Sequence, residues 1–267
     1  MLNYESQEFK SLEELKETTP SIFTKKGSVN TSSKYTHIPT DTVIKDLELL
    51  GWGVVDAQEV KARKQVGYQK HLVVLRNNDV VINGKDGDTV YPQILLTNSH
   101  DGKNSFSFQA GLYRMICENG LVIATEEFEN YKIRHMGYDF ETLQGVIKDM
   151  IANLDLTVES MNKMKATELT EEQTLDFAKQ LLETRVAGSK NKFGNEAIAD
   201  ILTPQRKQDK GNGLWEVFNR VQENIVEGNF QYLTPGGKLR QARPIKNFRQ
   251  DMNINAKMYE QALTFAA

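Results

Sequence analysis

The segment Leu96–Arg114, LTNSHDGKNSFSFQAGLYR, carries the clearest fold signal in this chain of 267 residues. Runs of β-branched and aromatic residues lie on both sides of Asp101-Gly102, and these two residue types adopt the left-handed conformations that a tight turn requires. The segment therefore predicts a β-hairpin closed by a two-residue turn. That turn would place His100 at the end of a strand, close to solvent.

Similar runs precede this hairpin and extend the prediction to a larger sheet. Short stretches of β-branched and aromatic residues recur from Trp52 onward, divided by turn signals, which is typical of an antiparallel meander. Residues 40–53, TDTVIKDLELLGWG, predict a short amphipathic helix capped by Thr40 or Asp41. Residues 1–39 are charged, then rich in Ser and Thr, and predict a polar, loosely packed N-terminal arm.

After the sheet region the apolar residues recur at helical spacing. Asp139 is suited to cap a long helix, and Thr170 with Gln173 forms the pattern of a capping box before a second helix. Residues 214–229, LWEVFNRVQENIVEGN, predict another helix, and a short helix is expected near the C-terminus.

These patterns predict an α+β fold, with an antiparallel β-meander in the first half and a helical second half packing on it. The expected organisation is a polar N-terminal arm at residues 1–39 and a helix with the sheet at residues 40–138. A helical region with a basic C-terminal segment follows at residues 139–267, in one compact unit with the sheet.

Composition narrows the class of protein. The formal net charge is −3, so the chain as a whole does not attract nucleic acid or an anionic membrane surface. No run of apolar residues reaches the length of a membrane span or forms a signal peptide. A single cysteine and histidines without close ligand spacing favour a reducing cytoplasm, no metal and no cofactor.

The chain offers few candidates for catalysis. Cys117 with His100 could form a thiol and base pair, but the apolar neighbours of Cys117 favour a buried structural sulfur. The segment 188–195, GSKNKFGN, lacks the ending and the preceding strand of a phosphate-binding P-loop. The sequence therefore assigns no catalytic residue, and an enzyme is the least favoured class.

Positive charge is concentrated between residues 201 and 250. This segment has nine Lys and Arg against four Asp and Glu, an excess of five, with aromatic residues between them. Cations bind backbone phosphates while aromatic rings stack on unpaired bases, which is typical of a groove for single-stranded nucleic acid. The candidate nucleic-acid-binding residues are Arg220, Lys238, Arg240, Arg243, Lys246 and Arg249. Trp215 and Phe218 are assigned instead to a helix face in the core.

Three blocks of the sequence resemble a known family. LTNSHDGKNSFSFQAGLYRMICENGLVI, LWEVFNRVQENIVEG and RPIKNFRQDMNINAKMYEQA resemble the phage/plasmid-like proteins catalogued as domain of unknown function 932, from about Thr40 to the C-terminus. The resemblance implies a gene carried by bacteriophages, plasmids or integrated elements, and a protein that acts in the cytoplasm of a bacterial host. It implies no established activity.

One helix within the resemblance carries a polar cluster, which comprises Asn219, Gln222, Glu223 and Asn224. Such residues can bind a ligand or can anchor the basic segment through hydrogen bonds and ion pairs, and the sequence leaves both open.

The first functional hypothesis is a nonenzymatic DNA-binding protein of a mobile element, for example a single-strand binding or annealing factor in recombination or replication. The predicted helix, meander and long helix are similar to the ring-forming annealing proteins of phages and eukaryotes at the level of fold, so a homo-oligomer is compatible with it. The second hypothesis is a module that binds a host or phage protein, such as an inhibitor of host defence. An enzyme of unknown reaction is the third.

Overall fold

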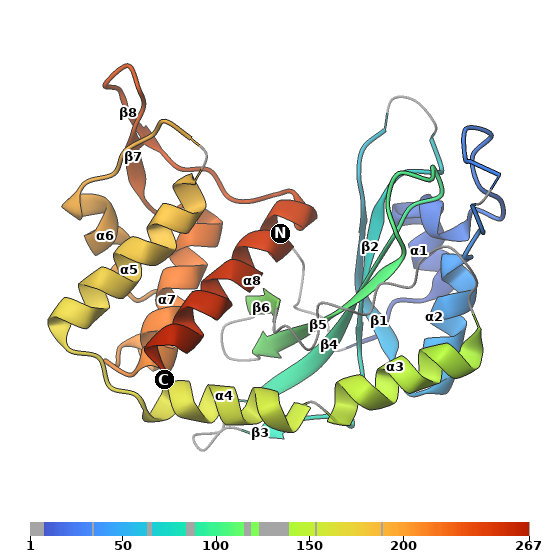
Figure 1. The fold of residues 1–267 in the computed structure, drawn as a ribbon, viewed down its shortest axis with the longest axis horizontal. Coiled ribbons are helices and arrows are strands. Elements are labelled where there is room, and N and C mark those ends of the chain that lie inside the picture. The colour runs from blue at the N-terminus through green and yellow to red at the C-terminus, as the bar shows by residue number, and fades with distance from the viewer. Residues whose placement is uncertain are drawn as a thin grey trace. The chain divides into compact units, whose positions relative to one another are not determined.

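The computed structural model describes residues 8–33, 35–62, 66–83, 89–114, 119–122, 139–152, 154–187 and 189–266 (Figure 1). The chain forms two compact units, Leu2–Leu154 and Asp155–Ala267. We call them the sheet unit and the helical unit and describe each by itself. Strands lie mainly in the first half and helices dominate the second, which confirms the α+β class.

The sheet unit contains a six-stranded antiparallel sheet in the order β1-β2-β4-β5-β6, with β3 paired to β4. Its strands are β1 Gly53–Glu59, β2 His71–Arg76, β3 Ile82–Asn83, β4 Thr89–Asn98, β5 Ser107–Arg114 and β6 Asn119–Val122. Neighbouring strands in the sheet are mostly consecutive in the chain, which confirms the predicted meander. Strand β1 lies at one edge and has a register shift between Val54 and Asp56.

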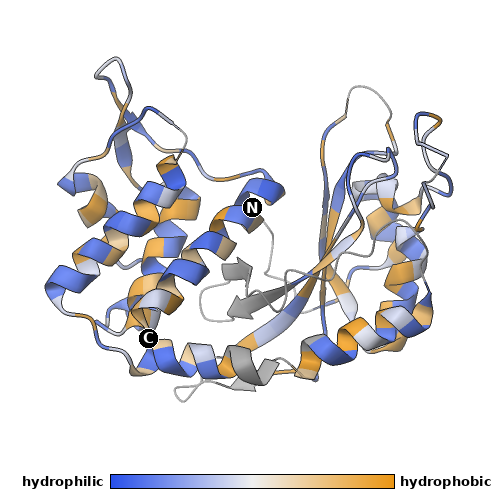
Figure 2. Ribbon diagram, in the orientation of Figure 1, coloured by the Kyte–Doolittle hydropathy of each residue, from blue (hydrophilic) through white to orange (hydrophobic). Residues whose placement is uncertain are grey.

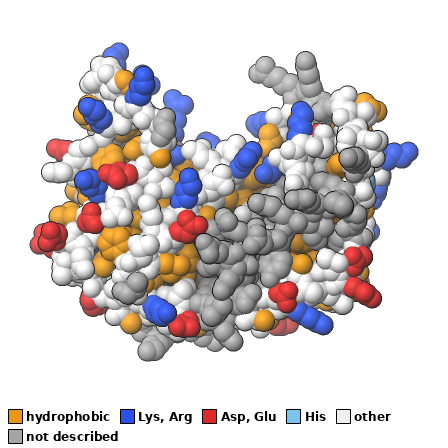
Figure 3. Space-filling view, viewed as in Figure 1, with side chains coloured by type: hydrophobic (Ala, Val, Ile, Leu, Met, Phe, Trp, Pro, Cys, Tyr) orange, Lys and Arg blue, Asp and Glu red, His pale blue; other side chains and the backbone are white. Residues whose placement is uncertain are grey.

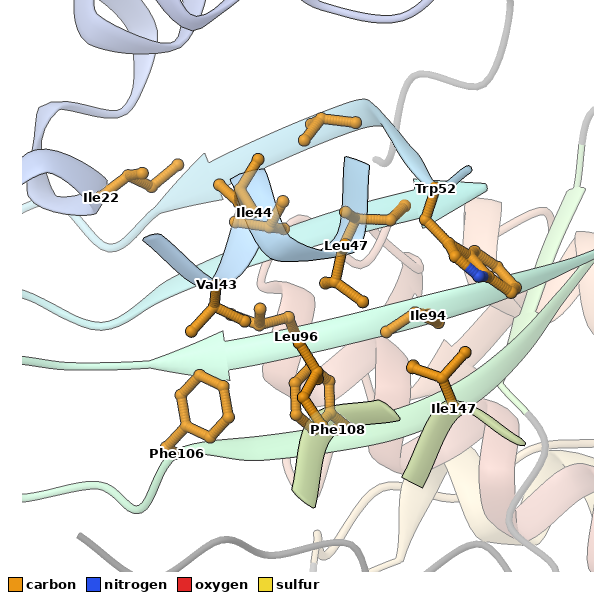
Figure 4. Close-up of a cluster of buried hydrophobic side chains, with 14 of the residues drawn as sticks. Ile22, Val43, Ile44, Leu47, Trp52, Ile94, Leu96, Phe106, Phe108 and Ile147 are labelled. Atoms are coloured by element: carbon orange, nitrogen blue, oxygen red, sulfur yellow. The ribbon is translucent and has the colours of Figure 1, made fainter. Parts of the chain in front are cut away.

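Helices cover this sheet and complete its core. They are α1 Leu12–Thr18, the 3-10 helix η1 Pro20–Phe23, α2 Thr40–Leu49 and α3 Phe140–Ala152. Figure 4 shows Val43 and Leu47 of α2 beside side chains from the strands, such as Ile94 and Leu96, and beside Phe106 from the loop before β5. Ile147 of α3 lies in the same cluster. Helix α3 therefore belongs to the sheet unit, and Asp139 caps it as expected by accepting from the Thr142 amide at 2.7 Å.

The N-terminal residues differ from the expected loose arm. Leu15, Ile22 and Ile38 are fully buried in the core of the sheet unit. Ser11 and Glu14 form a capping box at the start of α1. The amide of Lys10 donates to the Val54 carbonyl of strand β1 at 2.7 Å. The segment is mostly polar, so its composition did not predict burial. Its few apolar residues nevertheless pack into the same core as α2 and fix the segment against the sheet unit.

The loop between β4 and β5 also differs from the predicted turn. Gly102 has the expected positive φ of 76°, but the connection runs from Ser99 to Phe106 rather than over two residues. His100 is fully buried, and its backbone amide donates to the Tyr68 carbonyl while its own carbonyl accepts from the Ser28 amide. The prediction of a solvent-exposed His100 was therefore wrong.

The start of α2 is a smaller correction. Pro39 is the N-cap residue, and no side chain caps the helix. The Thr40 hydroxyl instead lies 2.9 Å from Nε2 of His71, inside the sheet unit. A tertiary hydrogen bond has replaced the local cap that the sequence predicted.

The helical unit is built around helix α7 (Leu214–Glu227), most of whose residues are buried. Its elements are α4 Leu154–Ala166, α5 Glu171–Val186, α6 Asn195–Leu202, the 3-10 helix η2 Lys207–Asp209, α7 Leu214–Glu227, β7 Gln231–Leu233, β8 Leu239–Gln241 and α8 Phe248–Phe265. Trp215 and Phe218 of α7 are buried, as expected, and the Phe218 ring meets Tyr259 of α8 edge-on at 6.0 Å. Thr170 and Gln173 form the predicted capping box of α5.

Helices α5 and α8 lie against one another and against α7. Both show alternating hydrophobic and hydrophilic bands in Figure 2, as expected of helices with one buried face. The rings of Phe177 and Phe265 meet at 5.0 Å, and the Thr184 hydroxyl donates to the Gln261 side chain at 2.9 Å. Among the described residues, no helix is long and apolar enough to cross a membrane.

Candidate nucleic-acid interface

One group of exposed cations in the helical unit lies on the β7–β8 hairpin, on the segment after it and at the start of α8. Five of the six predicted residues are exposed there: Lys238, Arg240, Arg243, Lys246 and Arg249. Figure 3 shows Lys and Arg side chains gathered at the hairpin end of this unit, at the upper left. Within the described part of the chain, none of the five forms an ion pair with a carboxylate.

The segment that carries Arg243 is fixed by backbone contacts rather than left loose. The Ala242 amide donates to the Phe230 carbonyl, and the Ile245 amide donates to the Val226 carbonyl, both at 2.9 Å. Gly228 ends α7 with a φ of 74°, and a Cβ at this position would lie 2.8 Å from the Arg243 backbone. Glycine is therefore required both by the left-handed conformation and by the close approach of the segment.

A hollow of about 480 Å³ lies between the end of α5 and the first turns of α8. We call it the α5–α8 groove. It is lined by Thr184, Arg185, Ala187, Asn247, Arg249, Gln250, Asn253, Ile254 and Lys257. Three of these residues are cationic and none is acidic, although the chain as a whole is acidic. Such a lining attracts anions and offers several amides as hydrogen-bonding groups.

A second hollow of about 220 Å³ adjoins the hairpin, and we call it the hairpin pocket. It is lined by Arg185, Val186, Ser189, Asn191, Phe230, Tyr232, Ala242 and Arg243, again without a carboxylate. Arg185 lines both hollows, so they adjoin at this side chain. Its Nη2 donates to the Arg243 carbonyl at 2.9 Å, which holds the guanidinium between them. Burial lowers the pKa of Arg185, while the neighbouring Tyr232 raises it.

Arg220 does not belong to this surface. Its side chain is buried, and Nη1 donates to the carbonyls of Asp209 at 3.0 Å and Gly211 at 2.8 Å. Burial lowers its pKa, partly offset by the charges of Asp209 and Glu216. Arg220 therefore holds the loop before α7 in place. The sequence analysis assigned it to the binding surface because a count of charged residues does not show which of them are buried.

The polar cluster of α7 is also turned inward. Asn219 donates to the Trp215 carbonyl, Gln222 donates to Asn255 of α8, and Glu223 pairs with Arg206. Asn224 donates to the carbonyls of Ile201 and Thr203 at the end of α6. Of the two roles that the sequence left open, these contacts favour anchoring, and they hold α6 and α8 against α7.

Two cations of the α5–α8 groove were missed by the sequence analysis. Lys257 follows Arg249 and Asn253 at four-residue intervals, so the three lie on one face of α8, and this spacing was a usable signal. Arg185 had no comparable signal, because its place depends on how the end of α5 packs against the hairpin segment.

Three histidines that are far apart in sequence converge inside the sheet unit. The ring of His100 lies 4.6 Å from that of His37 and 5.4 Å from that of His71. Nδ1 of His71 lies 3.0 Å from the Ser21 hydroxyl, and burial lowers the His71 pKa to about 4. Among the described residues no group of side chains is arranged to hold a metal ion. Both ring nitrogens of His71 lie within 3.0 Å of a hydroxyl, that of Ser21 or that of Thr40, and on these contacts we assign His71 a structural role. Cys117 and His135 lie outside the described residues.

Asp251, in the first turn of α8, is a buried carboxylate whose pKa burial raises to about 6. A raised pKa in the folded state means that folding favours the protonated acid, so the helical unit should lose stability as the pH rises from about 4 to 6. We expect Asp251→Asn, which can still accept from Asn255, to gain about 3 kcal/mol at pH 8 and nothing below pH 4. Urea unfolding at both pH values tests this, and an equal effect at both would contradict it.

The fold and the site define an α+β protein whose helical unit carries two basic hollows, lined by described residues of which none is acidic. The chain belongs to the family described as "Domain of unknown function (DUF932)", which matches residues 29–259 and confirms the resemblance seen in the sequence. It is similar to UPF0380 protein YafZ of Escherichia coli (strain K12), with 29% identity over 259 residues, or 94% of this chain and 89% of that protein. It is also similar to UPF0380 protein YfjQ of the same strain, with 29% identity over 261 residues, or 94% and 90% of the two chains. No solved structure matches the chain.

Proposed function

We propose that this chain is a nonenzymatic protein that binds single-stranded nucleic acid through its helical unit. The observation that carries the proposal is the pair of adjoining hollows joined by Arg185, with four cations and no carboxylate among the described residues that line them. Closely spaced cations neutralise successive phosphates of a strand, and the released counterions supply most of the affinity.

The exposed cations of the hairpin extend this surface. Arg240 lies opposite Tyr232 in the β7–β8 register, so a cation and an aromatic ring share one face of the hairpin. Basic side chains with an aromatic neighbour suit an unpaired strand better than a duplex, whose base faces are already stacked. The working model is a single-strand binding or annealing factor in the recombination or replication of a phage or plasmid, in the cytoplasm of a bacterial host.

The test is the binding of a fluorescent single-stranded oligonucleotide across a series of salt concentrations. Each phosphate contact contributes about 0.7 to the slope of log affinity against log salt. We expect the variant with Arg240, Arg243 and Arg249 changed to Ala to lose about 2 units of slope and about 100-fold in affinity at 0.1 M salt.

The matched control removes the same charge elsewhere. Lys26, Lys163 and Lys179 are exposed and lie outside both hollows. Changing them to Ala should alter affinity by less than about threefold, because none of the three lines a hollow and salt screens exposed charges. No binding in low salt by the folded wild-type protein would refute the proposal and direct the search to protein partners, and an equal loss in both triple variants would refute this location.

A further inference from the structure

We infer that the hairpin pocket holds one base of the bound strand, with Tyr232 as the stacking face and Arg185 joining that base to a phosphate in the α5–α8 groove. This inference rests on the proposed function and deepens it, because it names the chemical group that each hollow receives.

Tyr232 has the position that such a role requires. It lies in the middle of β7, is only partly buried, and lines the hairpin pocket beside the fully shielded Phe230. The hairpin that carries it is fixed on both sides, because β7 pairs with β8 and its Leu233 exchanges backbone hydrogen bonds with Lys192. The ring is therefore held in place before a base arrives, which lowers the entropy cost of stacking.

The volume and polar groups of the pocket suit a single base. Its 220 Å³ is below the size of common pockets for drug-sized ligands, about 300–1,000 Å³, and so fits one planar ring better than a whole nucleotide chain. Ser189 and Asn191 lie in its wall and offer a hydroxyl and an amide to the edge of a base. The Ser189 hydroxyl donates to the Val186 carbonyl at 2.7 Å, which fixes this part of the wall.

Arg185 connects the two hollows chemically. Its guanidinium has several donors in one plane, of which one bonds to the Arg243 carbonyl, so others are available to a phosphate. Arg249 and Lys257 add charge on the groove side, and Arg243 adds charge on the pocket side. A nucleotide places its base and its phosphate at opposite ends of one sugar, and adjoining hollows of these two kinds match that separation.

The first test uses an oligonucleotide that carries a single 2-aminopurine, whose fluorescence is quenched by stacking on an aromatic ring. We expect quenching by the wild-type protein and by Tyr232→Phe. Tyr232→Leu keeps an apolar side chain without a ring, and it should abolish the quenching and weaken binding about tenfold with the salt slope unchanged. Leu233→Ala, an exposed change at the next position of the same strand, is the control and should behave as the wild type.

A second measurement does not depend on any variant folding. A strand containing 5-iodouridine, irradiated in complex with the wild-type protein, should crosslink to Tyr232, which peptide mass spectrometry would locate. Salt-dependent binding with crosslinks only at other residues, or with full quenching by Tyr232→Leu, would overturn the inference and leave the proposed function standing. Absence of any strand binding by the wild-type protein would overturn both.

Discussion

Asn224→Ala is expected to lower the free energy of unfolding of the helical unit by about 3 kcal/mol. Asn224 is fully buried, and its amide donates to the carbonyls of Ile201 at 3.0 Å and Thr203 at 2.9 Å. These carbonyls lie at the C-terminal end of α6, where the last carbonyls of a helix have no hydrogen-bond donor within the helix itself. Removal of the amide leaves the buried Ile201 carbonyl without this donor, and an unsatisfied buried group costs about 1–3 kcal/mol.

Asn224→Asp should lower the free energy of unfolding of the helical unit further at pH 7, although Asp and Asn side chains are nearly the same size. A carboxylate has no donor and would place negative charge against both carbonyl oxygens. Acid should partly restore the variant, because a protonated carboxyl can donate one hydrogen bond. Asn195→Ala, at an exposed position of α6, is the control and should cost less than about 0.5 kcal/mol. Urea unfolding followed by Trp215 fluorescence measures all three, and a loss at Asn224 no larger than at Asn195 would contradict the prediction.

The sheet unit is expected to lose stability in mild acid because of His71. Its imidazole lies between the Ser21 hydroxyl at Nδ1 and the Thr40 hydroxyl at Nε2, and it is fully buried. Burial lowers the pKa of His71 to about 4, whereas an unfolded chain titrates near 6.5. Between these values the unfolded state binds the proton and the folded state does not. The free energy of unfolding should therefore fall by roughly 3 kcal/mol as the pH drops from 7 to 4.

The two tryptophans allow this effect to be assigned to one unit. Trp52 is buried in the sheet unit and Trp215 in the helical unit, so Trp215→Phe leaves a reporter for the sheet unit alone. His71→Gln removes the titrating group while keeping donor and acceptor atoms, and it should flatten the pH dependence. Equal urea midpoints at pH 7 and pH 4.5 for the Trp52 signal would refute the prediction. The helical unit serves as an internal contrast, because Asp251 gives it the opposite trend over this range.

Local patterns in the sequence predicted the elements that local physics determines. The capping box at Thr170, the Asp139 cap and the buried face of α7 all depend on residues within a few positions of one another, and all are present. The antiparallel meander could be predicted for the same reason, because most strands that pair in the sheet are neighbours in the chain.

What the sequence missed depends on contacts between distant residues. The meeting of His37, His71 and His100 follows from the packing of two loops against β2, and no spacing along the chain encodes it. Arg220 and Arg243 are both arginines in a basic segment, yet one is buried against carbonyls and the other is exposed. Composition thus located the basic region correctly but could not separate structural cations from those available to a ligand.

The contact between the N-terminal residues and strand β1 restricts how this protein can associate with itself. An open sheet edge is a ready template for strand addition by a second chain. Here the Lys10 amide already occupies the Val54 carbonyl, and the Phe9 ring lies where a side chain at Gly53 would project. Phe9 and Lys10 thus cover this part of the edge of β1. A ring or filament of this protein that used β1 as its seam would first have to displace Phe9 and Lys10 from this strand.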